Sequence, residues 1–171
     1  MKKILKSIFV LSFFVSLASS VSALENEKVD VLVEVVYLDQ NTSINDIVLD
    51  DGSMLSDYNY KVVYPLLRIN TTLGEYFTSV AWVTNPEGTT LSLNPKFSVR
   101  WDVNTNSTAW NVLSNTSVGL GSNPTFSSNY NKFHNQYLCH FALAKVKTYW
   151  NLDAWRPDVD IQAVYDSLCN P

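Results

Sequence analysis

The hydrophobic residues of this 171-residue chain change their period once, and this change limits the folds that are open to it. Between Val29 and Asp39 apolar and polar residues alternate, which is typical of a strand with one buried face. The residues that would share this face are Val29, Val31, Val33, Val35 and Tyr37. In the last third, apolar residues recur at three- and four-residue spacing, as on an amphipathic helix. The sequence therefore predicts the α+β class, with an antiparallel β-rich N-terminal part and a helical C-terminal part.

Further strands are expected over residues 60–69, 75–83 and 89–93. Pro65 would place the first of these at a sheet edge or interrupt it, because proline cannot donate a ladder hydrogen bond. The run Asn85-Pro86-Glu87-Gly88 predicts a hairpin turn between the other two, with proline starting the turn and glycine free to take a positive φ.

The middle of the chain carries weaker signals. Asp50-Asp51-Gly52 is typical of a turn. Phe97, Val99 and Trp101 alternate after Pro95, so they are candidates to extend the sheet. The polar residues 104–131 are expected to form a long connection with one short helical turn near Trp110.

Two helices are expected at the C-terminal end, and each carries one cysteine on its apolar face. The first face, within residues 133–150, comprises Cys139, Ala142, Leu143, Val146, Tyr149 and Trp150. The second helix follows Arg156-Pro157, is capped by Asp158 or Asp160, and has a face comprising Ile161, Val164, Tyr165, Leu168 and Cys169. Packing of the two faces would bring the sulfur atoms together, so we expect a Cys139–Cys169 disulfide. Two buried free thiols or a metal site are the alternatives.

The N-terminus has the three parts of a secretory signal. Lys2, Lys3 and Lys6 precede an apolar stretch over residues 8–18, and Val21-Ser22-Ala23 supplies small residues for cleavage. We therefore predict a bacterial signal peptide over residues 1–23, cleaved after Ala23, and a single exported domain over residues 24–171. The protein would then be periplasmic or secreted, where two cysteines normally pair. An uncleaved N-terminal anchor is the alternative.

The charge of the mature chain narrows the choice of partners. Loss of the three signal lysines from 12 basic residues leaves 9 against 16 acidic residues, a formal net charge of −7. Nucleic acid and anionic lipid both require a basic surface, so neither is expected as a partner, and no stable membrane insertion is expected after cleavage. No glycine-rich loop for phosphate is present, and no cofactor is expected.

Several runs near the C-terminus resemble a known family. They are Gln136-Tyr137-Leu138-Cys139-His140, then Lys147, then residues 150–158 with the sequence WNLDAWRPD, and finally Cys169-Asn170-Pro171. A weaker likeness extends upstream to about residue 90. This portion resembles the bacterial exported family of domains of unknown function 2599. The resemblance implies export and a Cys139–Cys169 pair, and it implies no activity.

The sequence contains no coherent catalytic constellation, and no catalytic residue is predicted. Cys139 and His140 are neighbours, so on a helix they would point about 100° apart and could not form a thiolate–imidazole pair. His134 and His140 are six residues apart and lack the spacing of a zinc-hydrolase pair, so no metal site is predicted.

Four residues remain as candidates for binding: His140, Trp150, Trp155 and Arg156. Flat aromatic side chains stack on sugars, and arginine holds carboxylates, so a glycan site is one interpretation. In the alternative interpretation, both tryptophans anchor the core, Arg156 pairs with Asp153 or Asp158, and a hydrogen bond satisfies the His140 ring.

Three functions are compatible with these observations. The favoured hypothesis is a non-catalytic binding or interaction domain at the cell envelope, whose partner is a protein or an envelope glycan. The second is a secreted enzyme or antibacterial effector that acts on the cell wall, with His140 in acid–base chemistry. The third is a periplasmic immunity or inhibitor protein.

Overall fold

Residues 30–49, 51–64 and 72–171 are described by the structure, a computed structural model, so the predicted signal peptide and Val29 lie outside the described residues. Five strands form one sheet in the order β2-β1-β3-β4-β5. Its strands are β1 (Val31–Leu38), β2 (Tyr60–Val63), β3 (Phe77–Asn85), β4 (Gly88–Pro95) and β5 (Trp150–Asp153). β1 and β2 run parallel, and the other neighbouring pairs run antiparallel. The predicted α+β class is confirmed, with a mixed sheet to which the C-terminal part adds β5.

The predicted hairpin between β3 and β4 is confirmed. Asn85 pairs with Gly88, and the Asn85 side chain accepts hydrogen bonds from the backbone N–H groups of Glu87 and Gly88. Gly88 has a φ of +151° and lies so close to Trp155 that an added Cβ would stand 2.6 Å from the Trp155 Cβ. Glycine is therefore required here by both backbone conformation and space.

One prediction about the first strand is wrong. Val31, Val33 and Val35 are buried on one face of β1, but Tyr37 packs on the opposite side of the sheet. The register of β1 against β3 shifts between Val35 and Tyr37, and such a bulge turns the following side chain to the other face. β2 occupies a sheet edge, and Pro65 to Ile69 lie outside the described residues.

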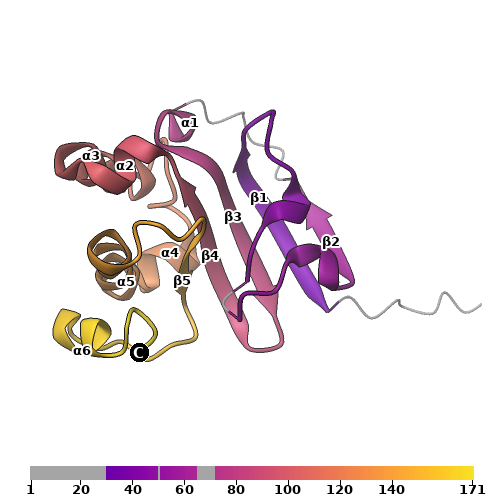
Figure 1. The fold of residues 1–171 in the computed structure, drawn as a ribbon. Coiled ribbons are helices and arrows are strands. Elements are labelled where there is room, and N and C mark those ends of the chain that lie inside the picture. The colour runs from indigo at the N-terminus through magenta and orange to yellow at the C-terminus, as the bar shows by residue number, and fades with distance from the viewer. Residues whose placement is uncertain (1–29, 50, 65–71) are drawn as a thin grey trace, which may run out of the picture.

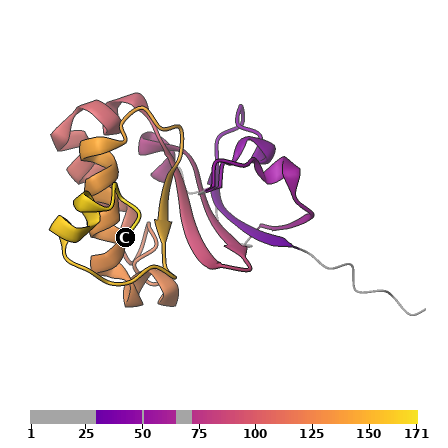
Figure 2. The same ribbon diagram turned by 60° about the horizontal axis from the view of Figure 1, so that its bottom comes forward.

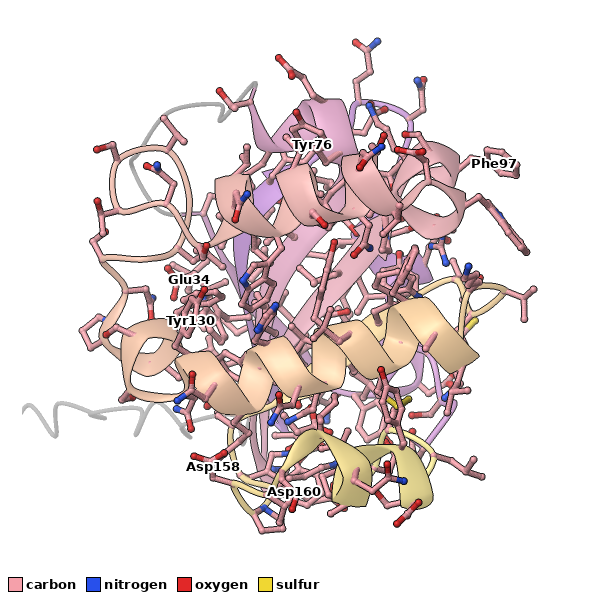
Figure 3. All side chains as sticks on the ribbon, turned by 90° about the vertical axis from the view of Figure 1, so that its left-hand side faces the viewer. Glu34, Tyr76, Phe97, Tyr130, Asp158 and Asp160 are labelled. Atoms are coloured by element: carbon pink, nitrogen blue, oxygen red, sulfur yellow. A yellow bond between two sulfur atoms is a disulfide. The ribbon has the colours of Figure 1, made fainter. Side chains whose placement is uncertain are left out.

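The helices cover one face of the sheet, as Figures 1 and 2 show. They are α1 (Leu73–Tyr76), α2 (Phe97–Trp101), α3 (Val103–Leu113), α4 (Pro124–Ser128), α5 (Tyr130–Leu143) and α6 (Ile161–Asp166). The larger core lies between these helices and the sheet. A second core lies on the other face, under the short 3-10 turns η1 (Ile44–Asp46) and η2 (Leu55–Asp57). Figure 3 looks onto the helical layer, where α5 runs between α3 and α6.

Residues 97–101 form helix α2 and not the predicted extension of the sheet. Val99 and Arg100 point inward, whereas Phe97 and Trp101 are exposed and pack on each other with ring centroids 6.0 Å apart. Residues four apart are neighbours on a helix and also share a face of a strand, so apolar residues at positions 97 and 101 are compatible with either structure. The two-residue spacing was therefore a misleading signal.

Much of the predicted connection over residues 104–131 is helical, as α3 and α4. Asp102 caps α3 by accepting a hydrogen bond from the Thr105 N–H at 2.6 Å. The buried face of α3 comprises Asn106, Ala109, Trp110 and Leu113. Asn106 is satisfied there by the Val99 carbonyl and the Tyr137 hydroxyl, both at 3.1 Å. Because the first buried residue of α3 is the polar Asn106, the three- and four-residue spacing of apolar residues that indicates a helix is incomplete here.

The long helix ends earlier than its apolar pattern predicts. α5 stops at Leu143, Val146 is exposed, and Trp150 begins β5. The buried Arg100 accounts for this ending, because its guanidinium donates to the carbonyls of residues 145, 147 and 148. These carbonyls turn toward Arg100, so the segment leaves the helix and returns to the sheet.

The Cys139–Cys169 disulfide is confirmed, with the two Cα atoms 5.5 Å apart. Asp160 caps α6 by accepting from the Ala163 N–H at 2.9 Å, as predicted. α6 ends at Asp166, and the chain then turns through positive φ values at Leu168 (+53°) and Cys169 (+72°), which leaves Leu168 exposed and Cys169 buried. No helix in the described part of the chain is long and apolar enough to cross a membrane.

Candidate functional site

The C-terminal runs that were singled out in the sequence meet between α5 and β5. The Gln136 side chain clamps the edge strand by accepting from the Asp153 N–H at 2.7 Å and donating to the Asp153 carbonyl at 3.1 Å. The buried Asp153 carboxylate accepts from the Thr90 hydroxyl and from the Arg156 guanidinium, each at 2.6 Å. This network fixes β5 against α5 and uses Arg156 in the ion pair with Asp153 that one interpretation predicted.

The two candidate tryptophans lie in different environments. Trp150 is fully buried between sheet and helices, and its indole N–H donates to the Ala144 carbonyl at 3.1 Å. Trp155 is 40% exposed, packs against the hairpin turn at Gly88, and lies under the Arg156 guanidinium at 4.4 Å. These residues do not form one aromatic platform, because Trp150 faces the core.

His140 lies on α5, only 3% exposed. Its Nδ1 lies 2.8 Å from the Gln136 carbonyl. A carbonyl only accepts, so Nδ1 carries the proton in the neutral ring and Nε2 is left as an acceptor. Burial lowers the pKa of His140 to about 4, and the charge of Lys147 also lowers it, against opposing effects of the Gln136 carbonyl and Asp153. The ring is therefore neutral at neutral pH.

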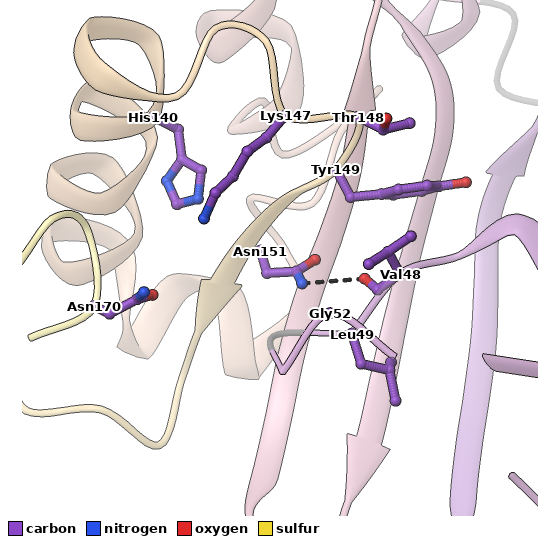
Figure 4. Close-up of a pocket in the computed structure, with 9 residues that line it drawn as sticks. All are labelled: Val48, Leu49, Gly52, His140, Lys147, Thr148, Tyr149, Asn151 and Asn170. Carbon is purple, nitrogen blue, oxygen red and sulfur yellow. Dashed lines mark hydrogen bonds between the residues drawn. The ribbon is translucent and has the colours of Figure 1, made fainter. Parts of the chain in front are cut away.

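A pocket of about 220 Å³ lies beside His140 (Figure 4). Its lining is drawn from α5, the segment between α5 and β5, β5 itself, the turn before η2, and the end of the chain. The lining residues are Val48, Leu49, Gly52, His140, Lys147, Thr148, Tyr149, Asn151 and Asn170. Leu49, His140 and Tyr149 are buried and form the floor, and the rim is exposed. The disulfide contributes to this site, because it ties Cys169 to α5 and thereby places Asn170 at the rim.

The polar groups of the pocket have unused hydrogen-bonding capacity. Asn151 donates its amide N–H to the Val48 carbonyl at 3.2 Å, which turns its Oδ1 the other way, and this buried oxygen has no partner among the described residues. His140 Nε2 also forms no hydrogen bond with a described residue. Lys147 extends beside the His140 ring (Figure 4), and no described carboxylate forms an ion pair with it. The pocket therefore presents one acceptor, His140 Nε2, and one cation, Lys147, while Asn151 Oδ1 is buried beneath the surface of its lining.

The described lining of the pocket contains no aspartate or glutamate. The described residues also contain no group of three histidine, cysteine or acidic side chains close enough to hold a metal ion.

Of the four candidates chosen from the sequence, only His140 lines this pocket. Lys147, Asn151 and Asn170 were not singled out as binding residues, although each falls inside a run that resembles the family. Periodicity could not identify them, since they lie on a loop, a short strand and the chain end. Val48, Leu49 and Gly52 carry no sequence signal beyond the predicted turn, which Gly52 forms with a φ of +84°.

Comparison with known proteins supports the resemblance. No curated protein and no solved structure matches the chain. Residues 77–171 match a family described as protein of unknown function (DUF2599), so the match begins at β3, earlier than the expected start near residue 90. It includes the hairpin, helices α2 to α6 and most of the pocket, whereas α1 and the Val48–Gly52 wall lie outside it. Because the match spans more than half of the sequence, the chain belongs to the DUF2599 family.

Proposed function

We propose that the mature protein is an exported, non-catalytic binding domain that holds an acidic sugar of an envelope glycan in the pocket beside His140. The observation that carries the proposal is the position of His140 Nε2, which has no hydrogen-bond partner among the described residues, beside the Lys147 ammonium, which forms no ion pair with a described carboxylate. Export rests on the signal-like N-terminus, and a disulfide without a membrane-spanning helix in the described chain is compatible with it.

The chemistry of the pocket selects the ligand class. The His140 acceptor requires a donor on the ligand, and a hydroxyl or amide N–H group supplies it. An ammonium donor would be repelled by Lys147, whereas a carboxylate would be attracted to it. At about 220 Å³ the pocket is smaller than the roughly 300–1,000 Å³ typical of sites for drug-sized ligands, so it suits one residue of a larger polymer. An acidic, N-acetylated sugar combines these features.

The pocket supports binding better than acid–base catalysis. A general base works best when its pKa lies near the ambient pH, and the pKa of His140 is held at about 4. No carboxylate among the described lining residues is placed to act with it as a second group. Cys139 is buried in the disulfide and supplies no thiolate.

The proposal is tested by NMR titration of the purified protein with N-acetylmuramic acid, which carries a carboxylate, and with N-acetylglucosamine, which lacks it. We expect the acid to shift the backbone resonances of residues 147–151 and 170, and to bind about tenfold or more tightly than the neutral sugar, because a charge-assisted hydrogen bond contributes roughly 1.5–3 kcal/mol. Lys147→Met should abolish this preference, and Lys61→Met, at the exposed edge strand, should preserve it.

Equal binding of the two sugars, or no binding of either, would overturn the proposal. Incubation with cell-wall sacculi separates the remaining functions. Sedimentation of the protein without release of fragments supports a binding domain, and release of soluble fragments supports the enzyme hypothesis.

A further inference from the structure

The charges of the chain are strongly segregated, although the whole chain is acidic. Residues 96–152, from the start of α2 into β5, contain five basic residues and a single acidic one, Asp102. The basic residues are Lys96, Arg100, Lys132, Lys145 and Lys147. The remaining acidic residues lie before and after this segment. Around α2 and the loop after α5, three of these lysines, Lys96, Lys145 and Lys147, lie near one exposed carboxylate, that of Asp102, so basic groups outnumber acidic ones there.

Three strongly exposed apolar side chains of this basic segment lie at one end of the helical layer. Phe97 is 76% exposed, Trp101 is 52% exposed, and Val146 in the loop after α5 is 85% exposed. Lys145 joins them, because its ammonium lies 5.4 Å from the Trp101 ring centroid and 4.4 Å from that of Phe141. We call Phe97, Trp101, Lys145 and Val146 the aromatic–basic tip. Figure 3 shows Phe97 standing clear of the ribbon at the start of α2.

The tip is preformed, because the buried Arg100 locks its two segments together. From α2 this guanidinium donates to the carbonyls of Lys145, Lys147 and Thr148, and also to the Pro95 carbonyl and the Asn94 side chain. The loop that carries Lys145 and Val146 is therefore fixed beside the helix that carries Phe97 and Trp101. Exposed apolar groups held in this way lose little further freedom on binding.

We infer that the aromatic–basic tip docks on the surface of an anionic phospholipid bilayer. Tryptophan and phenylalanine insert at the boundary between headgroups and acyl chains, and lysine keeps its ammonium among the headgroups. Phe97, Trp101 and Val146 are exposed beside Lys145, an arrangement that suits insertion at the surface of a bilayer. A second copy of the chain is a poor occupant, since a two-fold contact would bring like-charged tips together.

This inference differs from the expectation drawn from net charge. That expectation averaged the charge over the chain, whereas a bilayer senses only charges within about one Debye length of its surface, roughly 8 Å at physiological ionic strength. Asp102 directly follows Trp101 and is exposed, whereas the acidic residues of α6 and its flanking segments lie on the other side of α5 from α2 (Figure 3).

The test is co-sedimentation of the purified protein with vesicles of phosphatidylglycerol and phosphatidylethanolamine, compared with vesicles of phosphatidylcholine alone. We expect binding to the anionic vesicles that weakens as salt is added. Lys145→Glu reverses one charge at the surface and should weaken binding about tenfold or more. The double variant Phe97→Ser/Trp101→Ser should weaken it at least as much.

Matched controls keep the result interpretable. Leu168→Ser removes an equally exposed apolar residue beyond α6, and Lys61→Glu reverses a distant charge on β2. Both should bind like the unaltered protein. Val146→Ser alters only a solvent-exposed side chain of the tip, and should weaken binding even if the double variant fails to fold. Absence of binding to anionic vesicles overturns the inference, as does binding that the tip variants leave unchanged.

Discussion

Protonation of His140 should destabilise the protein as pH falls. The ring is buried and neutral in the fold with a pKa of about 4, whereas a histidine in the unfolded chain titrates near 6.5. Between these two pH values the unfolded state binds more protons, so the free energy of unfolding decreases as pH decreases through this window. Above it both states are neutral and the stabilisation is complete.

The two pKa values determine the size of the effect. His140 should contribute a loss of about 2 kcal/mol at pH 5 and about 3 kcal/mol at pH 4, relative to neutral pH. The charged groups that act on the ring are Lys147, which disfavours its protonation, and Asp153, which favours it. Burial dominates both, so salt should change the effect only slightly.

Urea unfolding of the unaltered protein and of His140→Asn, at closely spaced pH values from about 7.5 to 4, measures this contribution. Whatever its stability at neutral pH, the free energy of unfolding of this variant should decline less steeply between about pH 6.5 and 4. His134→Asn is the matched control, because His134 stacks on Trp110 and burial lowers its pKa too. This variant keeps the His140 contribution, so its stability should still decline steeply as the pH falls. Parallel pH curves for the unaltered protein and His140→Asn would refute the reasoning.

Three further changes test the fold. Cys139→Ala/Cys169→Ala opens a link with a sequence separation of 30, and should lower the free energy of unfolding in urea by about 3–4 kcal/mol on the chain-entropy model. Gly88→Ala forces a positive φ and a contact with Trp155, and should lower the thermal midpoint by an amount equivalent to about 1–3 kcal/mol. Arg100→Met leaves several loop carbonyls without their donor, and should cost about 2–4 kcal/mol and speed amide exchange in the loop after α5.

Much of the β-sheet could be predicted from the sequence, because strand period and turn chemistry are local. β1, the β3–β4 hairpin and the cap of α6 all follow from neighbouring residues. The bulge in β1 and the edge strand β5 could not be predicted, since both depend on contacts distant in sequence. β5 is a four-residue strand that Gln136 clamps from α5, and its residues alone resemble the end of a helix.

The helical layer was harder to predict, because polar side chains occupy its buried positions. Asn106, Gln136 and His140 stand where the helical period calls for apolar residues. Each is satisfied by a long-range or i−4 hydrogen bond that no local pattern reveals. The pocket could not be predicted from local patterns either, because its lining residues come from segments as distant in sequence as Val48 and Asn170.

The places where the periodic pattern fails are also the places from which both proposals arise. Stability of the fold alone favours apolar residues at the buried positions of α5 and polar residues at the exposed positions 97, 101 and 146. This chain departs from that rule at a few positions: it buries a neutral His140 on α5 under a pocket and leaves Phe97 and Val146 in solvent. Such departures cost stability and persist in proteins mainly at functional sites. The segment between α5 and β5 takes part in both, since Lys147 lines the pocket and Val146 beside it belongs to the tip. If both proposals hold, the domain would present its pocket next to the bilayer on which it docks.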